Sequence, residues 1–277
     1  IRDTVEEKEN IYTCYVISED RKLEGVVSLK ELITSDDDVT IESIMNRNFV
    51  SAHANDDQEV VADVIKKYDL IILPVVDIEN RLLGIITIDD IIDVIEQEDT
   101  EDFHRMAGIS PVEETYLKTS AFTMARQRIM WLVVLMISAT FTGRIIKSYE
   151  DVLQSVVVLA SFIPMLMDTG GNAGAQSSTT VIRALSLGDV ETKDIFKILR
   201  KEFLTSFIVA VVLAAINYLR LITLTKTSLD VALVVSGTLI LVVIISKVIG
   251  AILPVVAKTF KLDPAIMAGP LITTIVD

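Results

Sequence analysis

The sequence predicts a two-part chain, with an α+β unit built as a tandem repeat followed by an all-α unit of several membrane-spanning helices. Three observations predict this. Two 19-residue segments resemble each other at an offset of 59 residues. Acidic residues outnumber basic ones 29 to 11 in residues 1–118, although the net charge of the whole chain is only −14. Long apolar runs follow from residue 129 onward. Such a sharp change in charge and hydropathy indicates two domains in different surroundings.

The repeat defines the first unit. Its first copy, YVISEDRKLEGVVSLKELI, runs from Tyr15 to Ile33, and its second copy, PVVDIENRLLGIITIDDII, runs from Pro74 to Ile92. Each copy reads as a β-strand, a polar turn, a second strand and the start of a helix. Repeats of this kind usually pack against each other across a pseudo-twofold axis. We therefore expect two matched β–β–α units in the first part of the chain.

This repeat resembles a pair of CBS domains, which are regulatory modules of many enzymes and channels. The resemblance covers about residues 1–98, with the first copy shortened at its N-terminus. Gly84, Thr87 and Asp90 are similar to the nucleotide-binding pattern Gly-x-x-Thr-x-x-Asp of some CBS pairs. The resemblance implies ATP as a ligand, with Thr87 and Asp90 in contact with ribose or phosphate. The alternative is local: Thr87 would cap a helix and Asp90 would be favoured by the helix dipole.

An acidic segment follows the second copy. Its apolar residues have helical spacing, so its acids gather on the opposite face. Eight acids lie within fourteen positions: Asp89, Asp90, Asp93, Glu96, Glu98, Asp99, Glu101 and Asp102. This face is either simply solvated or a sensor in which divalent cations relieve the repulsion. EF-hand spacing is absent, so weak oxygen-rich sites for hydrated Mg²⁺ fit best. We expect residues 99–128 to form an acidic linker helix, or plug, between the two units.

Composition excludes several functions. The acidic first unit would repel nucleic acid. The single cysteine, Cys14, fits a reducing cytosol. His53 and His104 are far apart, and the sequence has no nucleophile–base motif, so an enzyme is not expected.

The apolar runs predict a membrane domain over residues 129–277. We expect about five spans of a bilayer core about 30 Å thick, with the second span long or broken and the fifth truncated. Basic residues precede the first span and lie between the second and third and between the fourth and fifth spans. The N-terminus is therefore expected in the cytosol, with the spans in the inner membrane. Because the chain starts without Met and stops inside an apolar run, we expect further residues at both ends. The predicted spans are 129–146, 152–187, 202–224, 231–257 and 265–277.

The segment PMLMDTGGNAGAQSSTT, from Pro164 to Thr180, places polar residues at membrane depth. We expect its proline and glycines to weaken the helix and expose carbonyl groups, which is tolerated only where they line water or protein. Close helix packing would explain Gly170 and Gly174, but not Asp168, Asn172 and Gln176 as well. The segment is therefore predicted to line a pore.

The segment LDPAIMAGPLITTIVD ends at Asp277, near the middle of the last span. A carboxylate at that depth needs a cation or a basic partner, and Lys247 is the alternative partner. Two copies of Asp277 across a twofold axis would offer two negative charges to one Mg²⁺. That ion would keep its hydration shell.

Two motifs, Gly-Gly-Asn-x-Gly-x-Gln at Gly170–Gln176 and Pro-Leu-x-Thr-Thr-x-x-Asp at Pro270–Asp277, resemble the MgtE family of magnesium channels and transporters. The order of CBS pair, acidic helix and five spans is similar too. The resemblance implies a homodimer in the lipid bilayer, with a pore lined by the second and fifth spans. The pore and selectivity residues are then Asp277, Asn172, Gly170, Gly171, Thr273 and, as a departure from the family that adds an acidic position, Asp168.

The resemblance also implies a function, which is Mg²⁺ uptake closed by cytosolic Mg²⁺ at acids of the CBS pair and linker. The family's N-terminal helical domain is absent from this sequence, and Gly269 departs from its pattern. The alternatives are a broader carrier of divalent cations such as Mn²⁺ and Co²⁺, a CBS-regulated anion channel, which would need basic or amide-rich pore positions, or a membrane sensor without transport. The implied sensor residues are Asp57, Glu59, Asp69, Asp90, Asp93, Glu98, Glu101 and Asp102.

Overall fold

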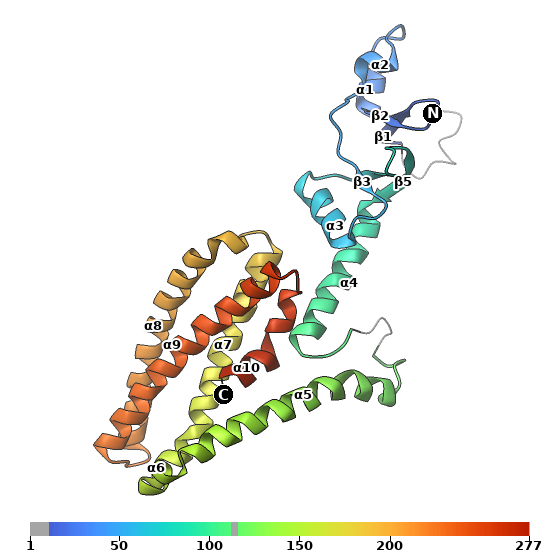
Figure 1. The fold of residues 1–277 in the computed structure, drawn as a ribbon. Coiled ribbons are helices and arrows are strands. Elements are labelled where there is room, and N and C mark those ends of the chain that lie inside the picture. Colours follow the sequence, from blue (N-terminus) through green and yellow to red (C-terminus); the bar gives the residue numbers. More distant parts are fainter. Residues whose placement is uncertain (1–10, 112–115, 277) are drawn as a thin grey trace. The chain divides into compact units, whose positions relative to one another are not determined.

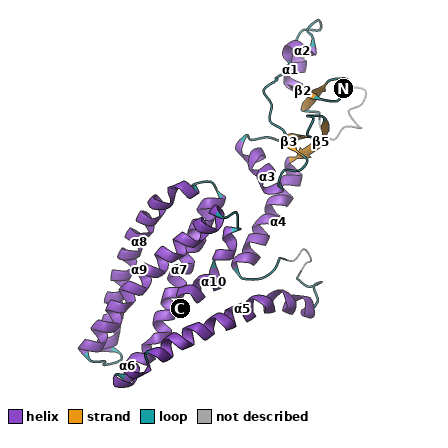
Figure 2. Cartoon of the chain, viewed as in Figure 1, coloured by secondary structure: helices purple, strands orange, loops and turns teal. Residues whose placement is uncertain are grey.

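The structure is a computed structural model that describes residues 11–111 and 116–276 (Figure 1). The chain divides into two compact units, residues 1–99 and 100–277. Among the described residues, strands occur in the first unit and the second unit is helical (Figure 2). The predicted fold class, an α+β unit followed by an all-α unit, is confirmed.

The first copy of the repeat forms a hairpin and a helix. Strands β1 and β2 pair antiparallel and lead into α1, and a short α2 follows. The bounds are Thr13–Ile17 for β1, Leu23–Ser28 for β2, Leu29–Thr34 for α1 and Ile41–Ile44 for α2.

The second copy is larger. Strand β4 pairs antiparallel with β5 and parallel with the short β3. Helices α3 and α4 pack on this sheet around a core that includes Leu73, Ile65 and Ile91. The bounds are Ala52–His53 for β3, Gln58–Lys67 for α3, Ile72–Val76 for β4, Leu82–Thr87 for β5 and Ile88–Met106 for α4.

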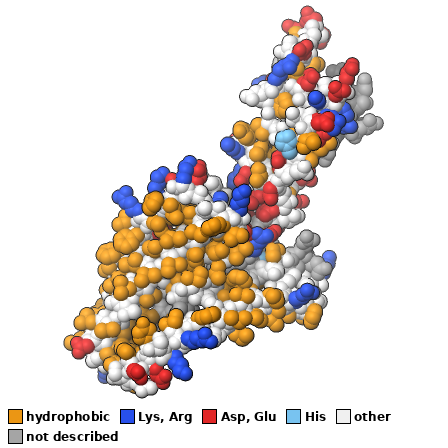
Figure 3. Space-filling model, viewed as in Figure 1, with side chains coloured by type: hydrophobic (Ala, Val, Ile, Leu, Met, Phe, Trp, Pro, Cys, Tyr) orange, Lys and Arg blue, Asp and Glu red, His pale blue; other side chains and the backbone are white. Residues whose placement is uncertain are grey.

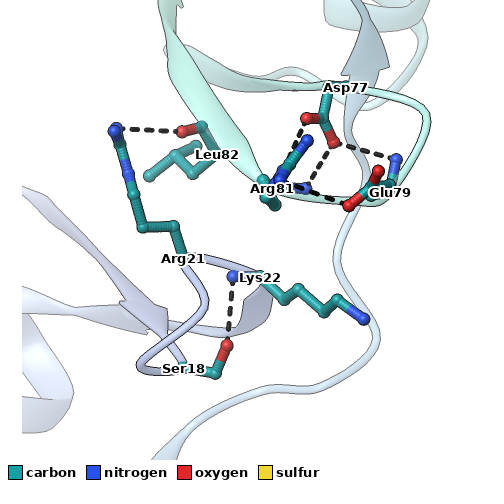
Figure 4. A network of polar contacts seen from close by, with 7 residues as sticks. All are labelled: Ser18, Arg21, Lys22, Asp77, Glu79, Arg81 and Leu82. Carbon is teal, nitrogen blue, oxygen red and sulfur yellow. Dashed lines mark hydrogen bonds and ion pairs between the residues drawn. The ribbon is translucent and has the colours of Figure 1, made fainter.

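The two hairpins meet turn against turn (Figure 4). The amide of Leu23 donates to the carbonyl of Asn80, and the amide of Leu82 donates to the carbonyl of Arg21, both at 2.9 Å. Arg21 and Asn80 both have left-handed backbones, with φ of 64° and 61°. These positions are 59 residues apart, so the contact has the pseudo-twofold symmetry that the repeat predicts.

The second unit is built from long helices. Helix α9 packs along both α7 and α8, and α10 packs on α7. Figure 3 shows hydrophobic side chains over most of the visible face of this unit. The bounds are Ala121–Ser148 for α5, Glu150–Ser155 for α6, Ile163–Ser186 for α7, Ile195–Thr223 for α8, Leu229–Thr259 for α9 and Gly269–Val276 for α10, with 3-10 turns η2 at Val157–Phe162, η3 at Thr192–Asp194 and η4 at Pro264–Met267.

Three helical segments are long and apolar enough to cross a membrane, among the residues that the structure describes. They contain α5, α8 and α9. Helix α7 has 24 residues but many polar side chains, and η4 with α10 forms a shorter apolar segment. The predicted second span, 152–187, is broken before Pro164, at α6 and the turn η2, and not within the glycine-rich motif.

The predicted linker helix over 99–128 does not form as one helix. Its first residues complete α4, which ends at Met106, and its last residues begin α5 at Ala121. Gly108 is left-handed (φ +68°), and the amide of Ile109 donates to the carbonyl of His104 at 2.9 Å. A left-handed glycine with this hydrogen bond is a common C-terminal cap of an α-helix. Pro111 follows and has no backbone N–H with which to continue a helix.

Candidate ion path and sensor

Helix α7 packs its glycines closely against its neighbours. A Cβ on Gly170 would lie 2.8 Å from Val242 of α9, and one on Gly171 would lie 2.8 Å from Thr273 of α10. A Cβ on Gly250 of α9 would lie 2.3 Å from the carbonyl oxygen of Gly174. Helix α7 is continuous through these glycines and buries Gly170, Gly171 and Gly174, so the expectation that they expose their carbonyl groups is wrong. They are buried because only glycine lets the backbones approach this closely.

The polar residues of the same motif lie on the other side of α7. Asp168, Asn172 and Gln176 are four residues apart, share one helix face and are exposed. We call these three residues the α7 polar face. The amide nitrogen of Asn172 donates to the backbone oxygen of Asp168 at 2.9 Å and to its carboxylate at 3.1 Å. At membrane depth such a face must meet water, protein or an ion.

Thr273 lies on α10, half-buried against Gly171. Its hydroxyl donates to the carbonyl of Pro270 at 2.8 Å, and the hydroxyl of Thr274 donates to the same carbonyl at 2.9 Å. Asp277, the predicted selectivity residue, lies outside the described residues, as does any pairing between it and Lys247. The structure thus brings Thr273 beside the glycine side of α7 and not beside the α7 polar face.

Two of the predicted sensor acids of the first unit, Asp57 and Asp69, lie at the ends of α3. Asp57 caps α3, with its carboxylate accepting from the amide of Glu59 at 2.9 Å. Asp69 is exposed and has a left-handed backbone just past the end of α3. The amide group of Gln58 donates to Glu98 at 2.6 Å. This bond brings the start of α3, with Asp57 and Glu59, to the acidic helix α4.

Thr87 and Asp90 bond to each other at the start of α4. The hydroxyl of Thr87 donates to the carboxylate of Asp90 at 2.8 Å. Ser28 and Glu31, at the matching positions, form a capping box with the same hydroxyl–carboxylate distance. The local reading of Thr87 and Asp90 as helix-start residues therefore fits the structure.

Arg105 lies in the last turn of α4, inside the second unit. It forms ion pairs with Glu101, one turn earlier, and with Asp263, which lies between α9 and α10. Its hydrogen bond to Asp263 raises the pKa of Arg105. Asp263 also accepts from the amide of Ala265 at 2.7 Å and so caps η4. No pattern in the sequence predicted this link, although Arg105 stands out as a base within a run of acids.

The predicted sensor residues do not converge within one chain. Over residues 11–111 and 116–276, no group of three or more His, Cys, Asp or Glu side chains is placed to hold a metal ion. Asp93 is exposed on α4, and Glu101 is paired with Arg105. Any ion held by these acids would need further ligands, such as water or a second copy of the chain.

Two family models match the chain. The CBS domain model matches residues 41–97, and the MgtE model, described as a divalent cation transporter, matches residues 163–277. The magnesium transporter MgtE of Thermus thermophilus is 35% identical over 281 residues, and that of Bacillus subtilis is 37% identical over 277 residues. Both alignments cover all of this chain. The chain carries the MgtE family's domain at residues 163–277 and is similar to MgtE transporters over its whole length.

The chain spans about three fifths of these MgtE relatives, since each alignment covers 61% of the relative's length. Both relatives are named as magnesium transporters, which agrees with the expectation that the chain is not an enzyme.

Two solved structures resemble a third of the chain. The soluble part of a magnesium transporter is 46% identical, covers 35% of this chain and 38% of that one, and has a TM-score of 0.34. The cytosolic domain of the Mg²⁺ channel MgtE in complex with ATP is 44% identical, covers 34% of this chain and 38% of that one, and has a TM-score of 0.33.

Proposed function

We propose that this protein carries Mg²⁺ across the inner membrane along a path that the α7 polar face lines. The observation that carries this proposal is the exposed row of Asp168, Asn172 and Gln176 on a helix packed among apolar helices. Similarity to magnesium transporters over the whole chain supports the choice of ion.

The chemistry of the face suits a hydrated cation. Mg²⁺ prefers oxygen ligands and loses its water reluctantly, so a path can bind its water shell instead of the bare ion. The amide nitrogen of Asn172 is used by Asp168, which leaves the amide oxygen of Asn172 to accept hydrogen bonds from bound water. The carboxylates of Asp168 and Asp277 supply negative charge. An anion channel would instead need donors or bases at these positions.

A second copy of the chain would complete the path. We propose a homodimer in which two copies of Asp277 face each other and offer two charges to one ion. The exposed α7 polar face and the apolar helix α5, in which none of the described residues is buried, leave surface for a partner and for lipid. The distribution of basic residues places the N-terminus in the cytosol.

The acidic helix α4 would make the path respond to cytosolic Mg²⁺. At high Mg²⁺, ions bound at the predicted sensor acids favour the closed state, and at low Mg²⁺ the repulsion between these acids favours the open state. The ion pair between Arg105 and Asp263 offers a route from α4 to the turn before α10. Gating of this kind needs only a difference in ion affinity between the two states.

ATP is a further ligand that we propose for the CBS pair. The support is the pattern formed by Gly84, Thr87 and Asp90, whose polar side chains lie together at the start of α4. ATP would have to displace the hydrogen bond between Thr87 and Asp90. A variant in which this hydrogen bond is stronger should therefore bind ATP less tightly.

Ion flux into proteoliposomes tests the transport proposal. The purified protein should carry Mg²⁺ down its gradient and leave Cl⁻ impermeant. Competition by Mn²⁺ or Co²⁺ at equal concentrations separates a selective Mg²⁺ path from a broader divalent one. Chloride flux without Mg²⁺ flux would instead favour the anion channel, and no flux of either ion would favour a membrane sensor without transport.

A further inference from the structure

A buried lysine lies in the centre of the helical unit. Lys247 is on α9 and is only 5% exposed, and it is the one Lys, Arg, Asp or Glu among the buried residues of the described chain. An ammonium group in such a place is unstable unless a counter-charge and hydrogen bonds compensate it.

A serine connects this lysine to a carboxylate. The ammonium of Lys247 donates to the hydroxyl oxygen of Ser177 on α7 at 3.3 Å. The hydroxyl of Ser177 donates in turn to the carboxylate of Glu202 on α8 at 2.6 Å. A serine hydroxyl has one proton and two lone pairs, so it can serve both groups at once. The three residues form one directed chain across three helices, which we call the 247–177–202 network.

The network lies directly behind the proposed ion path. Ser177 follows Gln176 of the α7 polar face and lies one turn beyond Gly174, which packs on Gly250. The next residue, Ser178, donates to the carbonyl of Met267 in the turn before α10 at 2.8 Å. The buried side of α7 is thus hydrogen-bonded to α8, α9 and the turn η4 before α10, at the level where its other side presents Gln176.

Glycine packing alone does not fix how α7 is rotated. Small residues let two helices approach but impose little directional preference, whereas hydrogen bonds between charged groups and a hydroxyl are strongly directional. Ridges of similar small side chains would also allow α7 to rotate or slide. The directed bonds of Ser177 select one of these arrangements.

We propose that Lys247, Ser177 and Glu202 are positioning residues for ion transport, which hold α7 at the rotation that turns the α7 polar face toward the ion. This proposal rests on the proposed function. In this role none of the three residues contacts the ion. Their role is to orient Asn172 and Gln176, so their loss should change how well the path recognises Mg²⁺ and not only how stable the protein is.

Ser177→Ala is the first test, because it removes the bridging hydroxyl, adds no volume and keeps a good helix former. Mg²⁺ uptake into proteoliposomes should need a Mg²⁺ concentration roughly tenfold or more higher for half-saturation, as expected for the loss of hydrogen bonds from a hydroxyl to charged groups. Thermal unfolding in detergent reports stability separately. A folded variant with the wild-type half-saturating concentration would overturn the proposal.

The charge pair gives a second test. Lys247→Met and Glu202→Gln each leave one charge inside the helical unit without its partner, so each should unfold at a lower temperature than the double variant. The double variant should recover stability because neither charge is left, yet it should keep the raised half-saturating concentration. Recovery of both properties in the double variant would show that the network serves stability alone and would reject the positioning role.

A labelling measurement separates this proposal from the transport proposal. In a Cys14→Ser background, Asn172→Cys should react with a water-soluble maleimide, and adding Ser177→Ala should slow that reaction about threefold or more if α7 rotates. Unchanged labelling would contradict the positioning role even if the protein carries Mg²⁺. If Ser177→Ala slows the labelling but the wild-type protein carries no Mg²⁺, the rotation of α7 is supported and the proposed transport function is rejected.

Discussion

At the scale of single residues, Asp77 shows how one carboxylate fixes a turn in the first unit. Its oxygens accept from the amides of Glu79 and Arg81 at 2.9 Å and from the side chain of Arg81 at 2.8 Å (Figure 4). These hydrogen bonds, chiefly those from Arg81, lower the pKa of the Asp77 carboxyl. The turn they form is the one that meets the hairpin of the first copy.

A pH-dependent loss of stability follows from this lowered pKa. The folded form favours the charged carboxylate, so Asp77 stabilises the protein above the ordinary carboxyl pKa, and the contribution disappears as the pH falls through the folded value. Asp77→Asn should therefore lower the unfolding temperature at pH 7, by an amount that shrinks as the pH approaches about 4 and below. Thermal unfolding across this pH range measures it.

Asp37→Asn is the matched control, because Asp37 is an exposed acid outside the turn. It should change the unfolding temperature little at any pH. A pH-independent difference between wild-type protein and Asp77→Asn would contradict the assigned role of the charge.

Residue pairs close in sequence were the easiest to predict. Thr87 and Asp90 are three residues apart, so a helix-start role follows from spacing alone, and the structure shows the bond. The pair Arg105 and Asp263 is separated by 158 residues. No local pattern indicates that these two charges meet.

At the scale of elements, α7 has a polar face and a glycine face, whose residues alternate along the sequence within one motif. The row formed by Asp168, Asn172 and Gln176 was predictable because its four-residue spacing is that of a helix face. The glycines were misjudged because glycine both weakens helices and permits close packing, and only the neighbouring helices decide between these effects. With α9 and α10 beside it, α7 remains continuous through Gly170, Gly171 and Gly174.

Gly250→Ala tests this packing. Its added methyl group would lie 2.3 Å from the carbonyl oxygen of Gly174, so the backbones of α7 and α9 must separate. Overpacking of this kind destabilises by about 1–3 kcal/mol. Thermal or denaturant unfolding in detergent should show this loss.

Gly237→Ala is the control on the same helix. A Cβ at Gly237 meets nothing within 4 Å among the described atoms. Alanine in an open helix position should stabilise by up to about 1 kcal/mol. Equal effects of the two substitutions would show that α7 and α9 do not pack through Gly174 and Gly250.

At the scale of the whole molecule, the sequence predicted the order of the parts better than their connection. The internal repeat and the apolar runs were sufficient for the fold class because both depend on patterns along the chain. The linker was mispredicted because the helical propensity of residues 99–128 was read without its stop signals, Gly108 and Pro111. The proposed gating joins these parts, since α4 runs from the first unit into the second.

Neutralising the predicted sensor should free the path from cytosolic Mg²⁺. In the triple variant Asp90→Asn, Asp93→Asn and Asp102→Asn, fewer carboxylates remain to bind the ion that favours closure. Uptake into proteoliposomes should then persist at cytosolic-side Mg²⁺ concentrations about tenfold or more above those that inhibit the wild-type protein.

The control removes the same charge elsewhere. The triple variant Asp36→Asn, Asp37→Asn and Asp38→Asn changes three exposed acids between α1 and α2 of the first unit. Its uptake should remain inhibited at wild-type Mg²⁺ concentrations. If both triple variants respond like the wild-type protein, closure does not depend on the acids of α4.

The central claim is that carboxylates within the membrane unit bind a hydrated Mg²⁺ ion on its way through. The most direct measurement is Mg²⁺ uptake into proteoliposomes by Asp277→Ala, with Asp230→Ala, an exposed acid at the start of α9, as the control. We predict that Asp277→Ala reduces uptake to the level of empty liposomes and that Asp230→Ala leaves it unchanged. Wild-type uptake by Asp277→Ala would contradict the account.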